Sequence, residues 1–151
     1  MLSGLVGLVL LPLSMGGNAA PLDVDGLWRT ARHGAIIAIR DCGDASPCGT
    51  IAGIPQDVTR GETADRRNPD TVAGTRPLIG LPVLWGFEGE GALWRNGRLY
   101  NPEDGKTFRA ALTLLDPDSL QVEGCFGPFC RSQVWHRHTD LAPPSNRALA
   151  E

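Results

Sequence analysis

Hydrophobic and polar residues alternate along most of the chain in short runs that have the length of β-strands. Residues 34–41 carry an apolar, β-branched run, and residues 50–54 resume the pattern after a turn that contains glycine and aspartate. A period of two places every second side chain on one face, as in half-buried strands. The 19 glycines and 12 prolines favour frequent turns. We therefore expect an all-β protein in which no helix exceeds about two turns.

The alternation in the second half of the chain predicts how neighbouring strands pair. The dipeptide Asn96-Gly97 is a strong signal for a two-residue hairpin turn, which would place Trp94 opposite Leu99. The next turn, residues 102–105, begins with proline and ends with glycine, and it would pair Leu99 with Phe108. These apolar side chains would then share one face of the sheet.

The same face continues by period two through Ala110, Leu112 and Leu114. Keeping Leu114 beside Val122 requires a turn with an odd number of residues, such as a bulged turn at 117–119. The opposite face is polar and is expected to face water. Its members are Tyr100, Lys106, Thr107, Arg109 and Thr113.

The amino-terminal segment has the pattern of a secretory signal peptide. A mainly apolar run at 5–13 is followed by small residues, and it is too short to span a membrane. Gly17 and Ala19 place the cleavage site after Ala19, so residues 1–19 are the expected signal peptide. No charged residue would be lost on cleavage.

The remaining chain has the size of one domain, which we expect at 20–138, followed by a flexible tail at 139–151. The net charge of −3, with both signs interspersed, argues against nucleic acid or an anionic membrane as a partner. No later apolar run approaches the length of a membrane span.

The four cysteines form two close pairs in the sequence, Cys42 with Cys48 and Cys125 with Cys130. In an exported chain an even number of cysteines favours disulfides, and the five and four intervening residues differ from the spacing of zinc knuckles. Three connectivities are open to four cysteines, and the two local bridges are preferred because each would close a turn.

Several longer blocks of the sequence are distinctive. They are Gly26-Leu27-Trp28-Arg29-Thr30, the stretch from Cys42 to Ile51, Asp65-x-x-Asn68-Pro69-Asp70, Arg76-Pro77-Leu78-Ile79-Gly80-Leu81-Pro82, Trp94-x-Asn96-Gly97-x-Leu99-Tyr100-Asn101-Pro102-Glu103-Asp104-Gly105-Lys106-Thr107-Phe108, and Val134-Trp135-x-Arg137. Together they resemble the bacterial family named domain of unknown function 2147, and the resemblance covers residues 26–137. It implies an exported, lipocalin-like β-barrel. Together with the strand pattern, this leads us to expect a single up-and-down antiparallel barrel of about eight to nine strands. It supplies neither catalytic residues nor a cofactor.

In such a barrel, Trp28 is expected to pack across one end, with Arg137 or Arg131 stacked on the indole by cation–π attraction. The alternative role of Trp28 is the floor of a ligand cavity. If the expected strand count holds, the Cys42–Cys48 and Cys125–Cys130 connections lie at the same end of the barrel.

The long polar segment at 55–75 exceeds an ordinary connection and is expected to be a functional flap, an ordered loop or a mobile segment. Its polar residues and those of the next blocks act either as local turn formers or, with Arg76 and Tyr100 as donors, as a site for a polar or anionic ligand at the barrel mouth. The candidate ligand-binding residues are Trp28, Asp65, Asn68, Arg76, Trp94, Tyr100 and Trp135.

Metal and hydrolase chemistry are weaker interpretations. His136 and His138 are spaced to share one face of a strand, with His33 or Asp140 as a third zinc ligand, but strand-end histidines are usually solvated. No serine lies in a nucleophile-elbow context. We therefore expect no metal and no enzyme.

Three functional hypotheses follow from these features. The preferred one is a non-enzymatic binder of a small apolar or amphipathic molecule held inside the barrel. The alternative is an envelope structural or interaction protein with a solid barrel, acting through the 55–75 loop. An enzyme would require Asp65, Arg76 and Tyr100 to converge in one open pocket.

Overall fold

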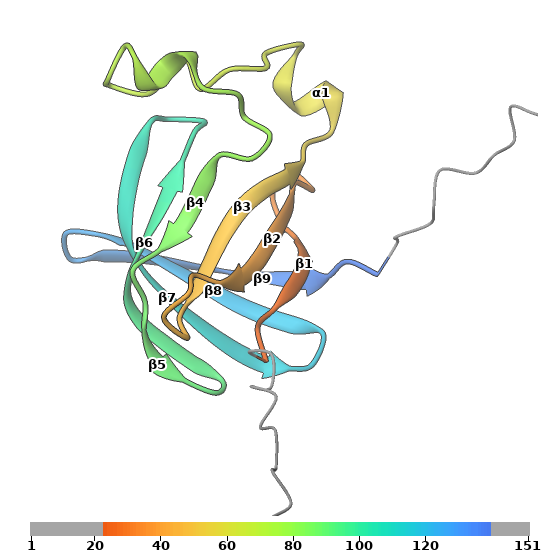
Figure 1. Ribbon diagram of the computed structural model, residues 1–151, viewed down its shortest axis with the longest axis vertical. Coiled ribbons are helices and arrows are strands. Elements are labelled where there is room, and N and C mark those ends of the chain that lie inside the picture. Colours follow the sequence, from red (N-terminus) through yellow and green to blue (C-terminus); the bar gives the residue numbers. More distant parts are fainter. Residues whose placement is uncertain (1–22, 140–151) are drawn as a thin grey trace, which may run out of the picture.

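A computed structural model describes residues 23–139, which form a closed antiparallel β-barrel (Figure 1). The strands are β1 (Gly26–Arg29), β2 (Ile36–Asp41), β3 (Pro47–Gly53), β4 (Pro82–Trp85), β5 (Glu88–Glu90), β6 (Leu93–Asn101), β7 (Lys106–Asp116), β8 (Ser119–Phe126) and β9 (Phe129–Arg137). The signal peptide expected at 1–19 and all but the first residue of the tail expected at 139–151 lie outside the described residues. Among the described residues, no helix is both long enough and apolar enough to span a bilayer.

The strands follow one another around the barrel, which confirms the expected up-and-down meander. Their order is β4-β3-β2-β1-β9-β8-β7-β6-β5, and a further pairing between β4 and β6 closes the ring. β4 and β5 both pair with the same edge of β6, β4 near its end and β5 near its start. The closed barrel therefore has eight strands, and β5 is an additional short strand. In the described residues the helical segments are one α-helix, α1 (Gln56–Thr59), and one 3₁₀ turn, η1 (Ala73–Thr75).

The barrel interior is lined by the apolar face that the alternation predicted. Leu112 and Leu120 are fully buried, and Val122 is nearly so. Because the sheet closes on itself, these side chains are buried from water without a second sheet or a layer of helices packed on them. Their burial stabilises the fold by about 25 cal/mol per Å² of apolar surface. The remaining buried members of this core include Ile37, Ile39, Ile51, Val83, Leu84, Phe87, Trp94, Ala110 and Trp135.

The strand register in the second half of the chain agrees in part with the predictions. Leu99 pairs with Phe108 across the 102–105 turn, as expected. Leu114, however, pairs with Leu120 and not with Val122, so the predicted neighbour was wrong. A register shift between Leu114 and Asp116 supplies the expected bulge and keeps the apolar residues on the inner face.

The predicted hairpin turn at Asn96-Gly97 was wrong, because both residues lie within β6. Asn96 takes a left-handed conformation with φ of 57°, and the β6–β7 register shifts between Trp94 and Gly97, which marks a bulge. Gly97 is required there because a side chain would collide with the ring of Phe87. Trp94 consequently pairs with Leu112, not with Leu99.

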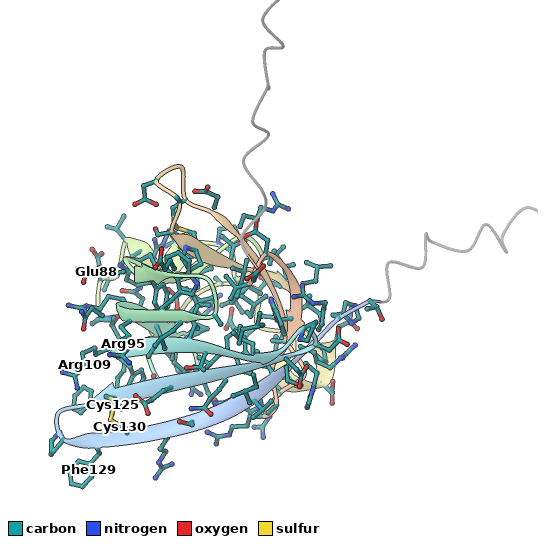
Figure 2. The ribbon with its side chains drawn as sticks, turned by 90° about the horizontal axis from the view of Figure 1, so that it is seen from below. Glu88, Arg95, Arg109, Cys125, Phe129 and Cys130 are labelled. Atoms are coloured by element: carbon teal, nitrogen blue, oxygen red, sulfur yellow. A yellow bond between two sulfur atoms is a disulfide. The ribbon has the colours of Figure 1, made fainter. Side chains whose placement is uncertain are left out.

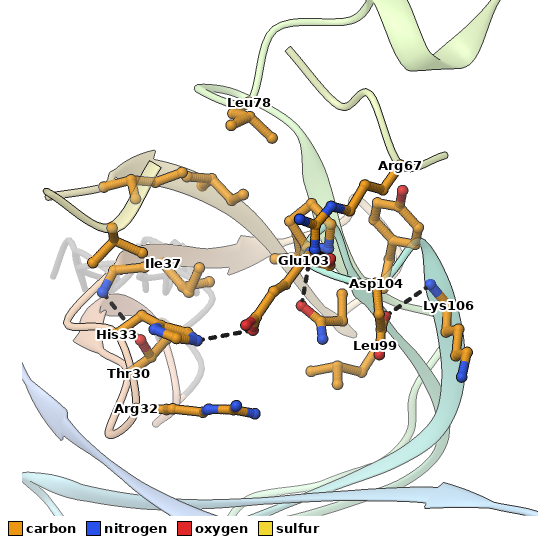
Figure 3. A pocket seen from close by; sticks show the side chains of 18 of the residues that line it. Thr30, Arg32, His33, Ile37, Arg67, Leu78, Leu99, Glu103, Asp104 and Lys106 are labelled. Carbon is orange, nitrogen blue, oxygen red and sulfur yellow. Dashed lines mark hydrogen bonds and ion pairs between the residues drawn. The ribbon is translucent and has the colours of Figure 1, made fainter. Parts of the chain in front are cut away.

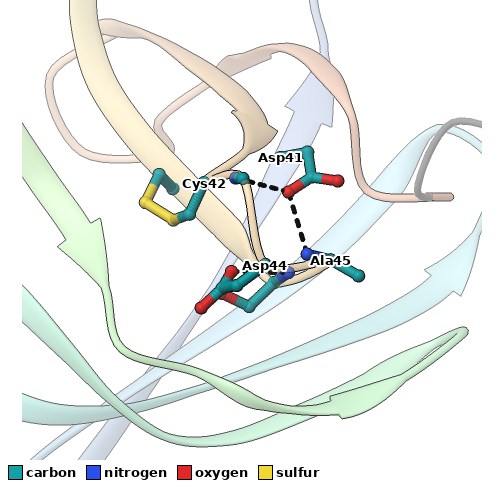
Figure 4. Close-up of a disulfide and its surroundings, with 7 residues drawn as sticks. Asp41, Cys42, Asp44 and Ala45 are labelled. Carbon is teal, nitrogen blue, oxygen red and sulfur yellow. Dashed lines mark hydrogen bonds between the residues drawn. A yellow bond between two sulfur atoms is a disulfide. The ribbon is translucent and has the colours of Figure 1, made fainter.

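Both disulfides join the local pairs that were expected, Cys42 with Cys48 and Cys125 with Cys130. In the first turn, the Asp41 carboxylate accepts the N–H of Ala45 at 3.0 Å (Figure 4). The chain crosses the barrel along β3, β4, β6, β7 and β8 between the two bridges. This odd number of crossings puts the bridges at opposite ends, so the prediction of a shared end was wrong.

Trp28 closes the end of the barrel away from the long loop, and its indole has no solvent exposure. The indole N–H donates to the Val24 carbonyl at 2.9 Å, and the Arg137 guanidinium lies 4.3 Å from the ring centroid. Arg137 is therefore the stacking partner, not Arg131. Gly26 has φ of 130°, and a Cβ at this position would lie 2.6 Å from Arg137 Nη1. The glycine of the Gly-x-Trp motif thus makes room for the arginine.

Candidate functional site

A cavity of about 1040 Å³ enters the barrel at the end opposite Trp28 (Figure 3). It lies beneath the connections β1–β2, β3–β4 and β6–β7, and it continues between the inner faces of the strands. Its inner walls are mainly apolar. They are formed by Ile37, Ile51, Val83, Leu99, Phe108, Val122 and Trp135.

The rim of the cavity is strongly charged, in contrast to its walls. Glu62 and Arg66 form an ion pair at 2.9 Å within the long loop. Counted formally, the basic side chains outnumber the acidic ones at this rim. They are Arg32, Arg60, Arg66, Arg67, Lys106 and Arg131, against Asp57, Glu62, Glu103 and Asp104.

One hydrogen bond spans the mouth. His33, in the β1–β2 connection, lies with Nε2 at 2.8 Å from a carboxylate oxygen of Glu103, in the β6–β7 turn (Figure 3). Arg67, from the long loop, donates to the Glu103 backbone carbonyl. Glu103 therefore ties three separate connections together over the cavity.

Two polar side chains of β9 face the cavity. Arg131 and Gln133 precede Trp135 by steps of two, and all three line the cavity. The Trp135 indole N–H donates to the Gln133 side-chain oxygen at 3.2 Å. Within residues 23–139, the guanidinium groups of Arg131 and Arg32 take part in no hydrogen bond or ion pair. Both cations are thus available to a ligand.

Asp65 is the most buried ionisable residue near the mouth, with no solvent exposure. Its carboxylate accepts the Tyr100 hydroxyl at 2.7 Å and the Asn68 amide at 2.9 Å, and Arg76 Nη2 lies 3.8 Å away. Burial, followed by the hydrogen bond to Asp65, raises the pKa of Tyr100 to about 12. These groups satisfy one another, so they form a closed structural cluster.

This cluster attaches the long loop to β6 through Tyr100, which is buried rather than facing water as expected. The loop is also held at the β6–β7 turn, where Gly105 packs so closely on the Arg67 carbonyl that a Cβ would not fit. Of the three descriptions expected for residues 55–75, the structure shows the ordered loop. Lys106 likewise departs from the expected polar face, because it lines the cavity.

The structure separates the seven candidate ligand-binding residues into groups. Tyr100 and Trp135 line the cavity, whereas Trp28 closes the opposite end. Trp94 is buried, with its indole N–H donating to the Gly91 carbonyl at 3.2 Å. The candidates Asp65, Asn68 and Arg76 hold the loop and do not line the cavity.

Sequence reasoning missed Arg131 and Gln133 as cavity residues. The signal was present, because period-two alternation counted back from Trp135 places both on the inner face. They were overlooked because charged and amide side chains usually mark the outer face of a barrel strand.

The histidines that could have formed a zinc site have separate partners, because His33 contacts Glu103 whereas His138 contacts Arg29. His138 Nδ1 lies 3.1 Å from an Arg29 guanidinium nitrogen, which is an unfavourable neighbour for a metal cation. Among the described residues, one group could present three ligand atoms within 4.8 Å, namely Glu123, Cys125 and Cys130. Its two sulfurs are joined in a disulfide, so they cannot act as thiolate ligands.

Comparison with solved structures finds the same fold in protein HP1028 from Helicobacter pylori, described as a member of the lipocalin family. The two share 18% sequence identity with a TM-score of 0.67, over 79% of this chain and 85% of that one. No curated protein matches the sequence. Residues 26–137, from the Gly-x-Trp motif to the arginine that stacks on it, match a family described as an uncharacterized protein conserved in bacteria. This chain, a lipocalin-like barrel, therefore belongs to the domain of unknown function 2147 family.

Proposed function

We propose that the protein is an exported, non-enzymatic binder of a small amphipathic molecule. The observation that carries the proposal is the cavity of about 1040 Å³, apolar inside and basic at its rim. Sites for small molecules are typically of this size, with mostly apolar walls and a few polar groups that orient the ligand. The two disulfides are consistent with a location outside the cytoplasm.

The distribution of groups suggests how the ligand would lie. Its apolar part would contact the inner walls near Val122 and Trp135, where burial from water supplies the free energy of binding. An anionic or polar end would remain at the rim, within reach of Arg131 and Arg32, which have no partner within the described residues. The neutral Gln133 side chain lies between these two regions.

Filling the cavity tests this proposal. Gly124 lies on the inner wall, where a Cβ would make ordinary contacts with Leu99 and Phe108 at 3.6 and 3.7 Å. Gly124→Leu is therefore expected to occupy the cavity without backbone strain and to weaken binding of the amphipathic anion 1-anilinonaphthalene-8-sulfonate at least about tenfold. Fluorescence titration measures the change.

The matched control is Gly53→Leu, at another strand glycine without a positive φ that does not line the cavity. It should leave the affinity for the dye within about twofold of the wild type. Equal affinities of wild type and Gly124→Leu would contradict an internal site. So would a purified protein that shows a bare apo mass in native mass spectrometry and takes up no dye.

The bond across the mouth predicts a kinetic effect. Glu103→Gln removes the charge that His33 contacts and is expected to speed dye release by about twofold to fivefold, because a half-exposed hydrogen bond to a carboxylate contributes about 0.5–1 kcal/mol. Stopped-flow dilution measures the release rate. Asp118→Asn is the control, since its ion pair with Arg137 lies at the closed end of the barrel, away from the mouth. If both variants release dye at the same rate, the bond across the mouth does not control release.

A further inference from the structure

The hairpin between β8 and β9 ends in two exposed aromatic side chains. Phe126 and Phe129 are direct cross-strand partners, and their side chains are 59% and 78% exposed. They flank the turn formed by Gly127 and Pro128. The next cross-strand pair is the Cys125–Cys130 disulfide, so a covalent bond holds the two strands together directly behind the aromatic tip (Figure 2).

This tip is continuous with the mouth of the cavity. Both phenylalanines line it, and the Phe126 ring packs edge-on against Phe108 with centroids 5.9 Å apart. Lys106 Nζ lies 5.8 Å from the centroid of the Phe126 ring, and Arg131 follows Phe129 by two positions on the same face. A surface that accepted the tip would therefore lie beside the entrance to the binding site.

The charge around the tip is basic, although the whole chain carries a net charge of −3. The strand segments behind the tip, 106–109 and 123–131, carry Lys106, Arg109 and Arg131 against the single acid Glu123. In the turn next to β7, the Asp104 carboxylate already accepts the backbone N–H of Lys106. Cations that flank an apolar tip are complementary to an anionic lipid surface.

We propose that this hairpin inserts its two phenylalanines into the interface of an anionic lipid bilayer, with the mouth of the cavity facing the membrane. The exposed aromatic area is roughly 300 Å², which is small beside the ~800 Å² per partner of a stable protein interface. Insertion into a bilayer needs only such a convex apolar tip. Pro128 has no N–H, which removes one of the two backbone donors that the turn would otherwise carry into the lipid.

Sedimentation with lipid vesicles tests the proposal. The folded protein is expected to bind vesicles that contain phosphatidylglycerol and to bind vesicles of phosphatidylcholine alone at least about tenfold more weakly. Phe126→Ser with Phe129→Ser should weaken binding to the anionic vesicles about tenfold or more. The control carries Leu93→Ser and Leu115→Ser, two apolar residues at the opposite end of the barrel with 38% and 52% exposure, and should bind as the wild type does.

Two outcomes would overturn the proposal: equal binding of the phenylalanine variant and the control, or no binding of the wild type to anionic vesicles. A dimer in light scattering that the phenylalanine variant abolishes, without vesicle binding, would assign the tip to a second copy of this chain. The test is independent of the proposed ligand, because Gly124→Leu should lose dye binding and retain vesicle binding. Thermal unfolding checks that each variant is folded.

Discussion

Replacing Trp28 with alanine is expected to lower the free energy of unfolding by about 3–5 kcal/mol, the largest effect of a single substitution in this barrel. The indole is fully buried at the closed end, so its truncation leaves a large cavity there. The change also removes the ring on which Arg137 stacks. Chemical denaturation followed by circular dichroism measures the loss.

The arginine makes the effect specific to this end of the barrel. Arg137 donates to the backbone carbonyls of Asp25 and Pro117, both at 2.7 Å, so it joins the chain before β1 to the β7–β8 turn. Trp28→Phe keeps an aromatic ring for Arg137 but loses the N–H that bonds to Val24, and it should cost about 1–2 kcal/mol. A loss below about 1 kcal/mol for Trp28→Ala would show that the indole does not support the barrel.

Asp65→Ala is expected to lower the free energy of unfolding by about 3 kcal/mol. The substitution leaves the Tyr100 hydroxyl and the Asn68 amide without their acceptor in a buried site. The long loop would then lose its attachment to β6. Urea denaturation measures the stability, and limited proteolysis within 55–75 measures the release of the loop.

Asp70→Ala is the matched control in the same loop, because Asp70 is exposed and caps only the local backbone N–H groups of Val72 and Ala73. It should cost less than about 1 kcal/mol. If the two aspartate variants are equally stable, Asp65 does not hold the loop.

The pH dependence gives a second test of the same cluster. Burial and the bond to Asp65 raise the pKa of Tyr100 from its usual 10.0 to about 12. The unfolded chain therefore releases this proton at a lower pH than the folded one, so the related stability is present below pH 10 and is lost as pH rises toward 12. Tyr100→Phe should lose this part of the alkaline dependence, measured by denaturation between pH 9 and 12.

Much of the barrel follows from local rules that act along a strand. The inward positions of Leu112, Leu120 and Val122 follow from a period of two. Leu114 pairs with Leu120 instead of the predicted Val122, but the bulge still leaves the apolar side chains of both strands on the inner face. Each disulfide closes a loop of fewer than ten residues, so proximity in the sequence was sufficient to predict both.

The error at Asn96-Gly97 has a physical cause. The dipeptide is favoured wherever the backbone needs a left-handed residue followed by one without a side chain. A two-residue turn needs this, but so does a bulge in which Gly97 makes room for the Phe87 ring. Phe87 is ten positions away in the sequence and becomes a neighbour only when β5 pairs with β6. The extra hairpin turn predicted at Asn96-Gly97 added one crossing of the barrel. It therefore assigned the Cys125–Cys130 bridge to the wrong end.

The sequence by itself determined the all-β class, the apolar inner face of β7 and β8 and the two disulfides, because each depends on periodicity or on near neighbours in the chain. The resemblance to a family supplied the barrel and the indole that closes one end. The tertiary structure alone decided which polar residues meet. Asp65 and Tyr100 are joined although 35 positions apart, and His33 and Glu103 although 70 apart. Such contacts depend on the order in which strands close the barrel and on the end at which each connection falls. Local alternation carries no information about either, so the cavity with its basic rim emerged only from the closed structure.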